Sequence, residues 1–221
     1  MKRVPCLELL DSDAGTSDEI NASLADLGRI NRWFGGTRTT QRMIEQVATH
    51  AGDTSLSLLD VAAGSGYVPQ KLQTLLATRQ LRLDVTLLDR SPAHVRNGTR
   101  AVAGDVLALP FRDGSFDLVS CVLFVHHLSP EHVIAFVNEG VRVCRRAVLI
   151  NDLIRHPVHL ALVYAGLPLY RSRLTRHDAP ASVRQAYTIA EMTDILRRTS
   201  AARVEITSHY LFRMGVMAWK A

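Results

Sequence analysis

The sequence predicts a single α/β domain in which short apolar strands alternate with amphipathic helices. Residues 56–61 are a nearly unbroken apolar run, too short for a typical helix and typical of a strand buried on both faces. A glycine turn at residues 64–66 and a helical pattern at residues 67–78 follow it, and residues 83–88 form a second apolar run. At 221 residues the chain has room for one such domain with a modest insertion, so we assign residues 1–221 to a single domain.

The glycine turn is typical of a nucleotide-binding site, because backbone N–H groups and a helix N-terminus there can meet the ligand. The third glycine of G-x-G-x-x-G is missing, which disfavours an NAD-dependent oxidoreductase, and no G-x-x-x-x-G-K-[ST] is present at this position. The spacing is instead Asp60-x-Ala62-x-Gly64-x-Gly66. This pattern of an acid, a small residue and G-x-G resembles motif I of the class I S-adenosylmethionine-dependent methyltransferases, whose cofactor carries a cationic sulfonium and no phosphate.

Two further stretches follow in the order of that family's motifs. Asp89-Arg90 ends the second apolar run, where a carboxylate can accept hydrogen bonds from both ribose hydroxyls. Gly104-Asp105, a Leu-Pro-Phe and an Asp-Gly-Ser-Phe-Asp before the next apolar run resemble the third and fourth motifs. Taken together, the chain resembles the class I methyltransferases and is closest to the small ubiquinone/menaquinone-type (type 11/25-like) group.

The resemblance implies a Rossmann-like seven-stranded sheet in the order 3-2-1-4-5-7-6, with its last strand antiparallel and helices on both faces. It also implies an N-terminal helical lid, residues 17–50, and a cap insertion after the fifth strand, residues 153–187. The implied cofactor is S-adenosyl-L-methionine, with S-adenosyl-L-homocysteine as product; Asp105 would face the adenine amino group and Val106 would supply a backbone N–H. The cofactor-binding residues that the resemblance implies are Asp60, Ala62, Gly64, Gly66, Asp89, Arg90, Asp105, Val106 and Leu123.

In the first half of the chain, residues 1–16 are expected to form an irregular leader. Ser17, with the acids Asp18 and Glu19, predicts the start of a helix that residues 33–36 break before a second helix at residues 37–50. After the second strand, the pattern predicts a helix at 92–98 and strands at 101–104 and 116–122.

In the second half, helix starts are the clearest features. Ser129 followed by Pro130 predicts a helix N-terminus, since serine caps and proline fits the first turn. A short turn leads to the fifth strand at 147–151, and the cap insertion is expected to be irregular, with one helix broken near Gly166. Thr188 and Glu191 form a capping-box pattern for the last helix. Strands at 204–207 and 211–219 would be the final antiparallel pair.

Candidate reactive groups follow from the position of the strand ends. Ligands of an open α/β sheet lie beyond the carboxyl ends of its strands, and His126 and His127 come directly after the fourth strand. Both are candidate catalytic bases, because imidazole titrates near neutrality; the alternative is that they only shape the pocket or cap the next helix. In the cap, the candidates for acceptor binding, with surface charges as the alternative, are Arg173, His177, Arg184 and Tyr187.

These expectations favour a metal-independent methyltransferase that moves the methyl group in line to a small-molecule acceptor, at a phenolic, quinone-like or polyketide-like oxygen or carbon atom. The chain lacks the Asn-Pro-Pro-Tyr and Asp-Pro-Pro-Tyr motifs of amino-methylating enzymes and the acidic metal set of catechol-type enzymes, so no metal ligands are assigned. An RNA methyltransferase and a non-catalytic cofactor-binding regulatory module remain as alternatives.

Composition and charge limit the expected binding partners of the protein and its expected cellular compartment. The net charge is +5, but the arginines of the last third are dispersed among apolar residues and no RNA-binding module is present, so nucleic acid is not the expected partner. Three cysteines without C-x-x-C spacing indicate neither a disulfide framework nor a zinc site. With no signal-peptide pattern and no apolar run long enough to span a bilayer, we expect a cytoplasmic protein, either a monomer or a homodimer.

Overall fold

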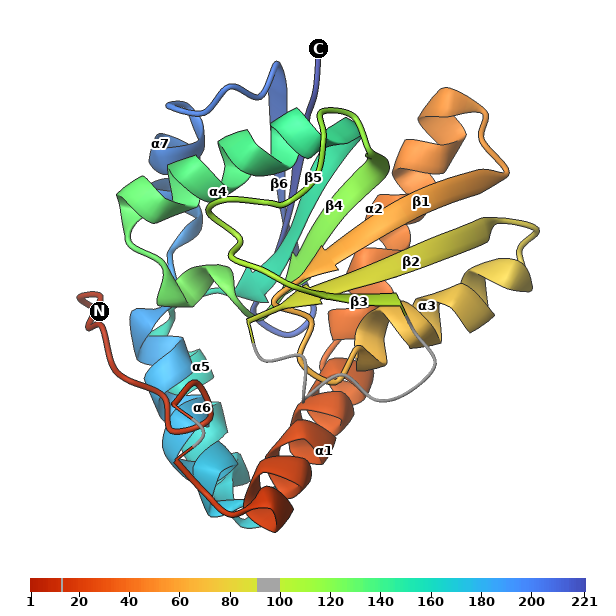
Figure 1. Cartoon of the computed structure of the whole chain (residues 1–221). Helices are drawn as coiled ribbons and strands as arrows, with labels where there is room; N and C mark the ends of the chain where they lie inside the picture. Colours follow the sequence, from red (N-terminus) through yellow and green to blue (C-terminus); the bar gives the residue numbers. More distant parts are fainter. Residues whose placement is uncertain (13, 91–99) are drawn as a thin grey trace.

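Seven strands form one mixed sheet in the order β3-β2-β1-β4-β5-β7-β6. The computed structural model describes residues 1–12, 14–90 and 100–221 (Figure 1). β7 runs antiparallel to both of its neighbours, β5 and β6, and the other neighbouring strands are parallel, which confirms the predicted topology. The strands are β1 (Ser55–Val61), β2 (Arg82–Asp89), β3 (Arg100–Ala103), β4 (Phe116–Val122), β5 (Cys144–Leu153), β6 (Arg203–His209) and β7 (Arg213–Trp219).

Helices cover both faces of the sheet. α4 and α7 lie on one face, and α2 and α3 lie on the other (Figure 1). None of the helices within the described ranges is long and apolar enough to cross a membrane. The helix expected at 92–98 falls outside the described residues. The described α-helices are α1 (Ser17–Trp33), α2 (Gly36–Ala51), α3 (Tyr67–Ala77), α4 (Pro130–Val143), α5 (Pro157–Gly166), α6 (Arg173–Gln185) and α7 (Ile189–Leu196).

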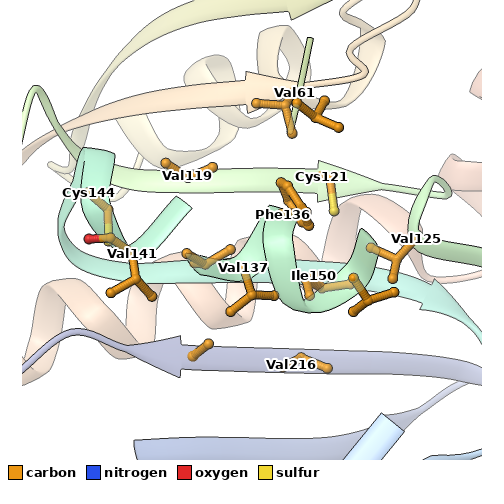
Figure 2. Close-up of a cluster of buried hydrophobic side chains, with 14 of the residues drawn as sticks. Val61, Val119, Cys121, Val125, Phe136, Val137, Val141, Cys144, Ile150 and Val216 are labelled. Carbon is orange, nitrogen blue, oxygen red and sulfur yellow. The ribbon is translucent and has the colours of Figure 1, made fainter. Parts of the chain in front are cut away.

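The alternation of side chains along β1 explains why its sequence is apolar throughout. Leu59 and Val61 belong to the core under α4, whereas Leu56 and Leu58 belong to the core under α2 and α3. Figure 2 shows the first of these cores, with Phe136 and other side chains of α4 packed over β4, β5 and β7. Since successive strand residues point to opposite faces, a strand covered on both sides needs apolar residues at nearly every position.

β5 is longer than the sequence pattern predicts. Cys144 is already paired with Phe116 of β4, and Leu153 is still paired with Arg213 of β7. The polar residues at its two ends conceal this length, because periodicity detects the buried centre of a strand and not the ladder that extends beyond it. The strand therefore carries Asn151 and Asp152 to the carboxyl edge of the sheet while both remain buried.

The first helix has its cap one residue before the expected position. Thr16, and not Ser17, is the N-cap of α1: its side chain accepts from Glu19 N, and the Glu19 side chain accepts from Thr16 N. This reciprocal pair is a capping box, which satisfies two N–H groups that have no partner within the helix. The capping box predicted for α7, from Thr188 and Glu191, is confirmed.

The cap insertion, residues 153–187, is mostly helical and not irregular as expected. α5 and α6 are joined by a short 3₁₀ helix, η3 (Leu167–Leu169). α6 packs on α1, where Ser23 and Thr175 hydroxyls lie 3.0 Å apart. Figure 1 shows α1 and the α5–α6 pair converging beyond the carboxyl ends of the strands. Helical periodicity is weak in α5 because its residues are apolar along most of the helix, and α6 buries polar side chains as well as apolar ones, so its buried face is not an apolar stripe.

The N-terminal strap, which we define as residues 1–12, lies against the cap. Asp178 of α6 accepts hydrogen bonds from the backbone N–H groups of Leu9 (2.8 Å) and Leu10 (3.0 Å). Arg3 donates to the carbonyl oxygens of His126 (2.9 Å) and Gln185 (2.6 Å). This segment contains no helix or strand, as expected for an irregular leader, but its anchors are residues far along the chain that no local pattern reveals.

Candidate functional site

A cavity of about 660 Å³ lies at the carboxyl edge of the sheet, enclosed by α1, the cap and the N-terminal strap. The strand ends supply one wall, and the lid and cap helices supply the other. The sequence-predicted residues that line it are Asp60, Ala62, Gly64, Asp89, Arg90, Asp105, Val106, Leu123, His126 and His127. Gly66 is not part of the lining.

The two glycines of the turn have different roles. Both have positive φ, +50° for Gly64 and +67° for Gly66. A Cβ on Gly64 would meet only Leu24, at 3.8 Å, so this position faces open space in the cavity. A Cβ on Gly66 would lie 2.6 Å from Leu87 Cδ1, so glycine there permits close packing of the turn on β2.

Two non-glycine residues at the cavity also adopt positive φ. Ala62, after β1, has φ of 50°, and Leu123, after β4, has φ of 57°. Left-handed backbone is unfavourable for residues with a Cβ and persists only where the surroundings impose it. Both residues line the cavity, at the ends of two adjacent strands. The chain therefore bends sharply at the two strand ends that form the floor of the cavity.

Asp60 is the buried acid at the end of β1. Its carboxylate accepts a hydrogen bond from Ser120 Oγ on β4. Burial raises the pKa of Asp60, the Ser120 hydrogen bond opposes this, and the charge of Asp89 adds to it, with a result of about 7. Near neutral pH this carboxyl group therefore sits close to the midpoint of its titration, at the cavity wall.

Asp89 and Asp105 stand at the ends of the next two strands. Asp89 Oδ2 accepts from the N–H of Gly64 at 2.8 Å, which ties the glycine turn to β2. Asp105 accepts from Leu107 N (2.9 Å) and from Arg90 Nη2 (2.7 Å), and these two contacts lower its pKa. The structure brings these side chains to one cavity with Gly64; that Asp105 faces an adenine amino group stays a prediction.

His126 is a buried histidine on η2 (Val125–His127), the 3₁₀ turn after β4. Its Nδ1 lies 2.6 Å from Asp152 Oδ1, and its backbone N–H donates to the other carboxylate oxygen at 3.0 Å. Burial alone would lower the pKa of His126, but the charge and hydrogen bond of Asp152, reinforced by Glu8, raise it to about 10. An imidazole that keeps its proton at neutral pH is poorly suited to act as a base.

His127 is more open to the cavity than His126, and its side chain is 17% exposed. Its Nδ1 lies 2.8 Å from Asp11 Oδ2 in the N-terminal strap, and its Nε2 lies 3.8 Å from Glu8 Oε2. Its ring stacks on Phe124, with centroids 6.1 Å apart. Of the two candidate bases, His127 has the geometry of an accessible imidazole oriented by a carboxylate.

Glu8 is a site residue that sequence reasoning missed. It is buried against the cavity, and its Oε1 accepts from Ser182 Oγ (2.6 Å) and Gln185 Nε2 (2.7 Å). Burial raises its pKa, but the neighbouring imidazoles of His126 and His127 and the Ser182 hydroxyl lower it below its ordinary value. The sequence signal is slight, a single acid among leucines in LELL at 7–10.

A second buried polar group that was missed holds the lid. Arg213 of β7 lines the cavity and is fully buried; its Nη2 donates to Asn31 Oδ1 at 3.0 Å and its Nη1 to Asn151 Oδ1 at 3.4 Å. Asn151 Nδ2 in turn donates to Gly36 O at 2.6 Å. Burial lowers the pKa of Arg213, to about 10. Asn151 thus links the lid to the sheet.

The structure does not bring the four cap candidates to the cavity lining. Arg173 pairs with Glu19, His177 with the adjacent Asp178, and Arg184 with the Tyr164 hydroxyl. Tyr187 is buried, and its hydroxyl donates to Leu128 O at 2.6 Å. The partners of the first three lie in the lid and the cap, and the partner of Tyr187 is the residue that follows η2. The cap contributes other residues to the lining, which are Leu153, His159, Leu162, Val163, Gly166, Leu169, Tyr170, Thr175, Asp178, Ala179, Ser182 and Val183.

Comparison with known sequences gives a match for the central part of the chain. A family described as "Methyltransferase domain" matches residues 59–150. A candidate methyltransferase of Encephalitozoon cuniculi (strain GB-M1) is 34% identical over 104 residues. That match covers 45% of this chain and 45% of the other protein, so the chain aligns with less than half the length of this curated relative.

Solved structures show the same fold over 75% to 96% of the chain. The plantazolicin methyltransferase BpumL, in complex with a monoazolic desmethylPZN analog and SAH, has a TM-score of 0.71 at 14% identity and covers 96% of this chain and 94% of its own. A SAM-dependent methyltransferase from Aquifex aeolicus has a TM-score of 0.55 at 18% identity and covers 75% and 82%. The magnesium protoporphyrin IX methyltransferase of Synechocystis PCC 6803 has a TM-score of 0.51 at 17% identity and covers 83% and 84%. At these identities the likeness shows a shared fold.

Proposed function

Because the chain has the class I methyltransferase fold and residues 59–150 match the methyltransferase domain, we propose that it transfers a methyl group from S-adenosylmethionine to a small-molecule acceptor. The observation that carries this proposal is the cavity of about 660 Å³ at the carboxyl edge of the sheet. It joins the glycine turn and the strand-end acids to the histidine turn and the helical cap. One enclosure thus has room for a methyl donor and an acceptor side by side.

The strand-end wall fits the donor. Gly64 leaves open space beside the turn, and Asp89 stands next to it as an acceptor for ribose hydroxyls. Asp60 places a carboxyl group where the cationic part of the donor would be favoured. When bound, S-adenosylmethionine supplies an electrophilic methyl group on a sulfonium, and the residues around it contribute binding and orientation.

The lid and cap wall fits a largely apolar acceptor. Leu24 and Leu27 of α1 and Leu162 and Val163 of α5 line this side, with Tyr170 as a polar neighbour. An apolar wall with a few polar groups orients a ligand without binding a strongly charged one. We therefore keep the proposed class of acceptor as phenolic, quinone-like or polyketide-like, and add azole-bearing compounds because a fold neighbour was solved with an azole-containing analog.

Alignment can supply much of the rate of an in-line displacement. The enclosure would hold acceptor and donor in that geometry and exclude water. Transfer of this kind does not require a metal ion at the donor. His127, oriented by Asp11, is the residue we propose to receive a proton from a phenolic or enolic acceptor. Arg173, His177, Arg184 and Tyr187 would then act through the shape of the cap.

The test has two stages. Calorimetry should show binding of S-adenosylmethionine and S-adenosylhomocysteine and none of NAD; the opposite preference would overturn the proposal. The protein should then transfer labelled methyl groups to at least one of a panel of phenols, quinols, polyketide-like enols and azole compounds. Transfer to RNA instead, with binding that weakens steeply as salt increases, would indicate the RNA methyltransferase. Cofactor binding without transfer to any class would favour the regulatory module.

A further inference from the structure

Three possible metal ligands meet in the cavity: Glu8 from the N-terminal strap and His126 and His127 from the turn after β4. One ligand atom from each lies within 4.8 Å of the others. All three residues line the same cavity. In the part of the chain that the structure describes, this is the only group of three or more histidine, cysteine or acidic side chains with such spacing.

The distances in this cluster suit a first-row transition metal. His126 Nε2 lies 3.5 Å from Glu8 Oε1, and His127 Nε2 lies 3.8 Å from Glu8 Oε2. A tetrahedral ion with bonds of about 2.1 Å holds its ligand atoms about 3.4 Å apart. The two separations from Glu8 are close to this value, and the ligand atoms of the two imidazoles lie within 4.8 Å of each other, so side-chain adjustments would place an ion between the three groups.

His126 Nε2 points into this cluster without a hydrogen-bond partner. The side chain is 2% exposed, and Nε2 is one of the few buried polar atoms of the described residues that form no hydrogen bond. Buried polar atoms nearly always form a hydrogen bond, and the ion-pair separation of 3.5 Å to Glu8 Oε1 is too long to be one. A ligand between His126 and Glu8 would supply the partner.

The surroundings orient each ligand as metal sites do. His126 Nδ1 lies 2.6 Å from Asp152 and His127 Nδ1 lies 2.8 Å from Asp11, so a carboxylate holds each imidazole by its other nitrogen. Such carboxylates are the usual partners of metal-binding histidines, because they fix the ring and raise its basicity. Glu8 is likewise held, by Ser182 and Gln185.

We propose that Glu8, His126 and His127 bind a divalent transition metal ion of the Zn²⁺ class. Two imidazoles and one carboxylate match the ligand preference of this class, whereas Mg²⁺ and Ca²⁺ prefer oxygen ligands alone. The ion takes the place of a proton on His126, since metal and proton compete for the same nitrogen. The sequence alone assigns no metal ligands. It does not reveal this site because Glu8 lies in the segment that was expected to be an irregular leader.

A site with three protein ligands leaves a coordination position open to the cavity. If the proposed function also holds, an oxygen of the methyl acceptor is the ligand that this position suits. The ion would then hold that oxygen and favour its deprotonated form in place of His127, whose Nε2 would be a metal ligand and not the base. This last step rests on the proposed function; binding of the ion does not. Metal binding can therefore be tested without donor or acceptor.

The experiment uses the full chain, freed of metal by a chelator and titrated with Co²⁺ while visible absorption is recorded, followed by competition with Zn²⁺. We expect the absorption of a low-coordinate Co²⁺ site, displacement by Zn²⁺, and no displacement by Mg²⁺. His127→Gln and Glu8→Gln should weaken Co²⁺ binding at least tenfold, and Asp11→Asn by about 10–100-fold. The matched control is His132→Gln, which removes an exposed histidine of the same cavity and should leave Co²⁺ affinity unchanged.

Thermal unfolding of each variant shows whether it has folded. Asp11 has a side chain that is 56% exposed, so Asp11→Asn keeps the test decisive even if the buried Glu8 variant is unstable. Wild-type protein that binds neither Co²⁺ nor Zn²⁺, or equal affinity in Asp11→Asn, His127→Gln and His132→Gln, would overturn the proposal. Failure to bind S-adenosylmethionine would overturn the proposed function and leave the metal site standing.

Discussion

Arg213 on the last strand donates a hydrogen bond from Nη2 to Asn31 Oδ1 near the end of the lid helix, with 3.0 Å between the two atoms, and both side chains are buried. The two residues are 182 positions apart in the chain. A buried guanidinium must have partners, because an unpaired one leaves its charge without compensation. The position of α1 over the cavity is therefore linked to β7, the last strand of the chain, which lies between β5 and β6 in the sheet.

Loss of this contact should destabilise the protein and loosen the lid. Asn31→Ala leaves a buried donor of Arg213 unpaired, and we expect the free energy of unfolding to fall by about 1–3 kcal/mol. Asn31→Asp keeps an acceptor at the same place and is the matched control, with stability near that of the wild type. Urea unfolding measures both; equal losses in the two variants would show that the hydrogen bond to Arg213 is not the cause.

Asp89 should determine cofactor affinity. Removal of its carboxylate in Asp89→Ala takes away the proposed charged acceptor for two ribose hydroxyls, so binding of S-adenosylmethionine should weaken by roughly 1.5–3 kcal/mol. Asp84→Ala is the control, because Asp84 lies on the same strand with an exposed side chain. Calorimetry on both, with circular dichroism to check folding, tests the assignment. Unchanged affinity in a folded Asp89→Ala protein would reject it.

Valine substitutions at the two glycines of the turn should have different effects. Gly64→Val places a side chain in open cavity space at a position of positive φ, so we expect a folded but somewhat less stable protein that no longer binds the cofactor. Gly66→Val forces a side chain against Leu87, so we expect a lower melting temperature as the main effect. Calorimetry and thermal unfolding separate the two outcomes. Normal cofactor binding by Gly64→Val would contradict the interpretation of this turn as the donor site.

Asp60 should make the protein less stable as pH rises from about 4 to 7, whereas a carboxyl group with a lowered pKa has the opposite effect. The pKa of Asp60 is about 7 in the folded protein and near 3.8 when exposed, so between these values the folded state holds a proton that the unfolded state has released. The contribution of Asp60 to stability is therefore complete below the unfolded pKa, and it declines as pH rises toward 7. Above pH 7 Asp60 is ionised in both the folded and the unfolded state, and it no longer makes the unfolding free energy depend on pH.

Asp60→Asn removes this titration while keeping the size of the side chain. The difference in unfolding free energy between wild type and Asp60→Asn should shift against the wild type as pH rises from about 4 to 7. Urea unfolding at a series of pH values measures it. A difference that stays constant over this interval would show that Asp60 is ionised throughout.

The sequence by itself determined the sheet and the donor side of the cavity. Apolar runs that end in Asp60 and Asp89, with Gly64 between them, place strand, turn and acid within a few residues of one another. Such features depend on local backbone geometry and on side-chain alternation, and neighbouring residues in the sequence determine both. The sheet order came from the resemblance that these motifs carry, and the structure confirms it.

Only the tertiary structure decided which contacts close the side of the cavity opposite the strand ends. Glu8 meets His126 because the N-terminal strap is anchored to Asp178 in the cap, and Arg213 reaches Asn31 from the opposite end of the chain. These are contacts between polar side chains far apart in sequence, so neither periodicity nor spacing reveals them. The cap misled sequence reasoning for a related reason. α6 packs on α1 and buries polar groups such as Thr175 as well as apolar ones, and α5 is apolar along most of its length, so neither helix shows a simple pattern of one apolar face.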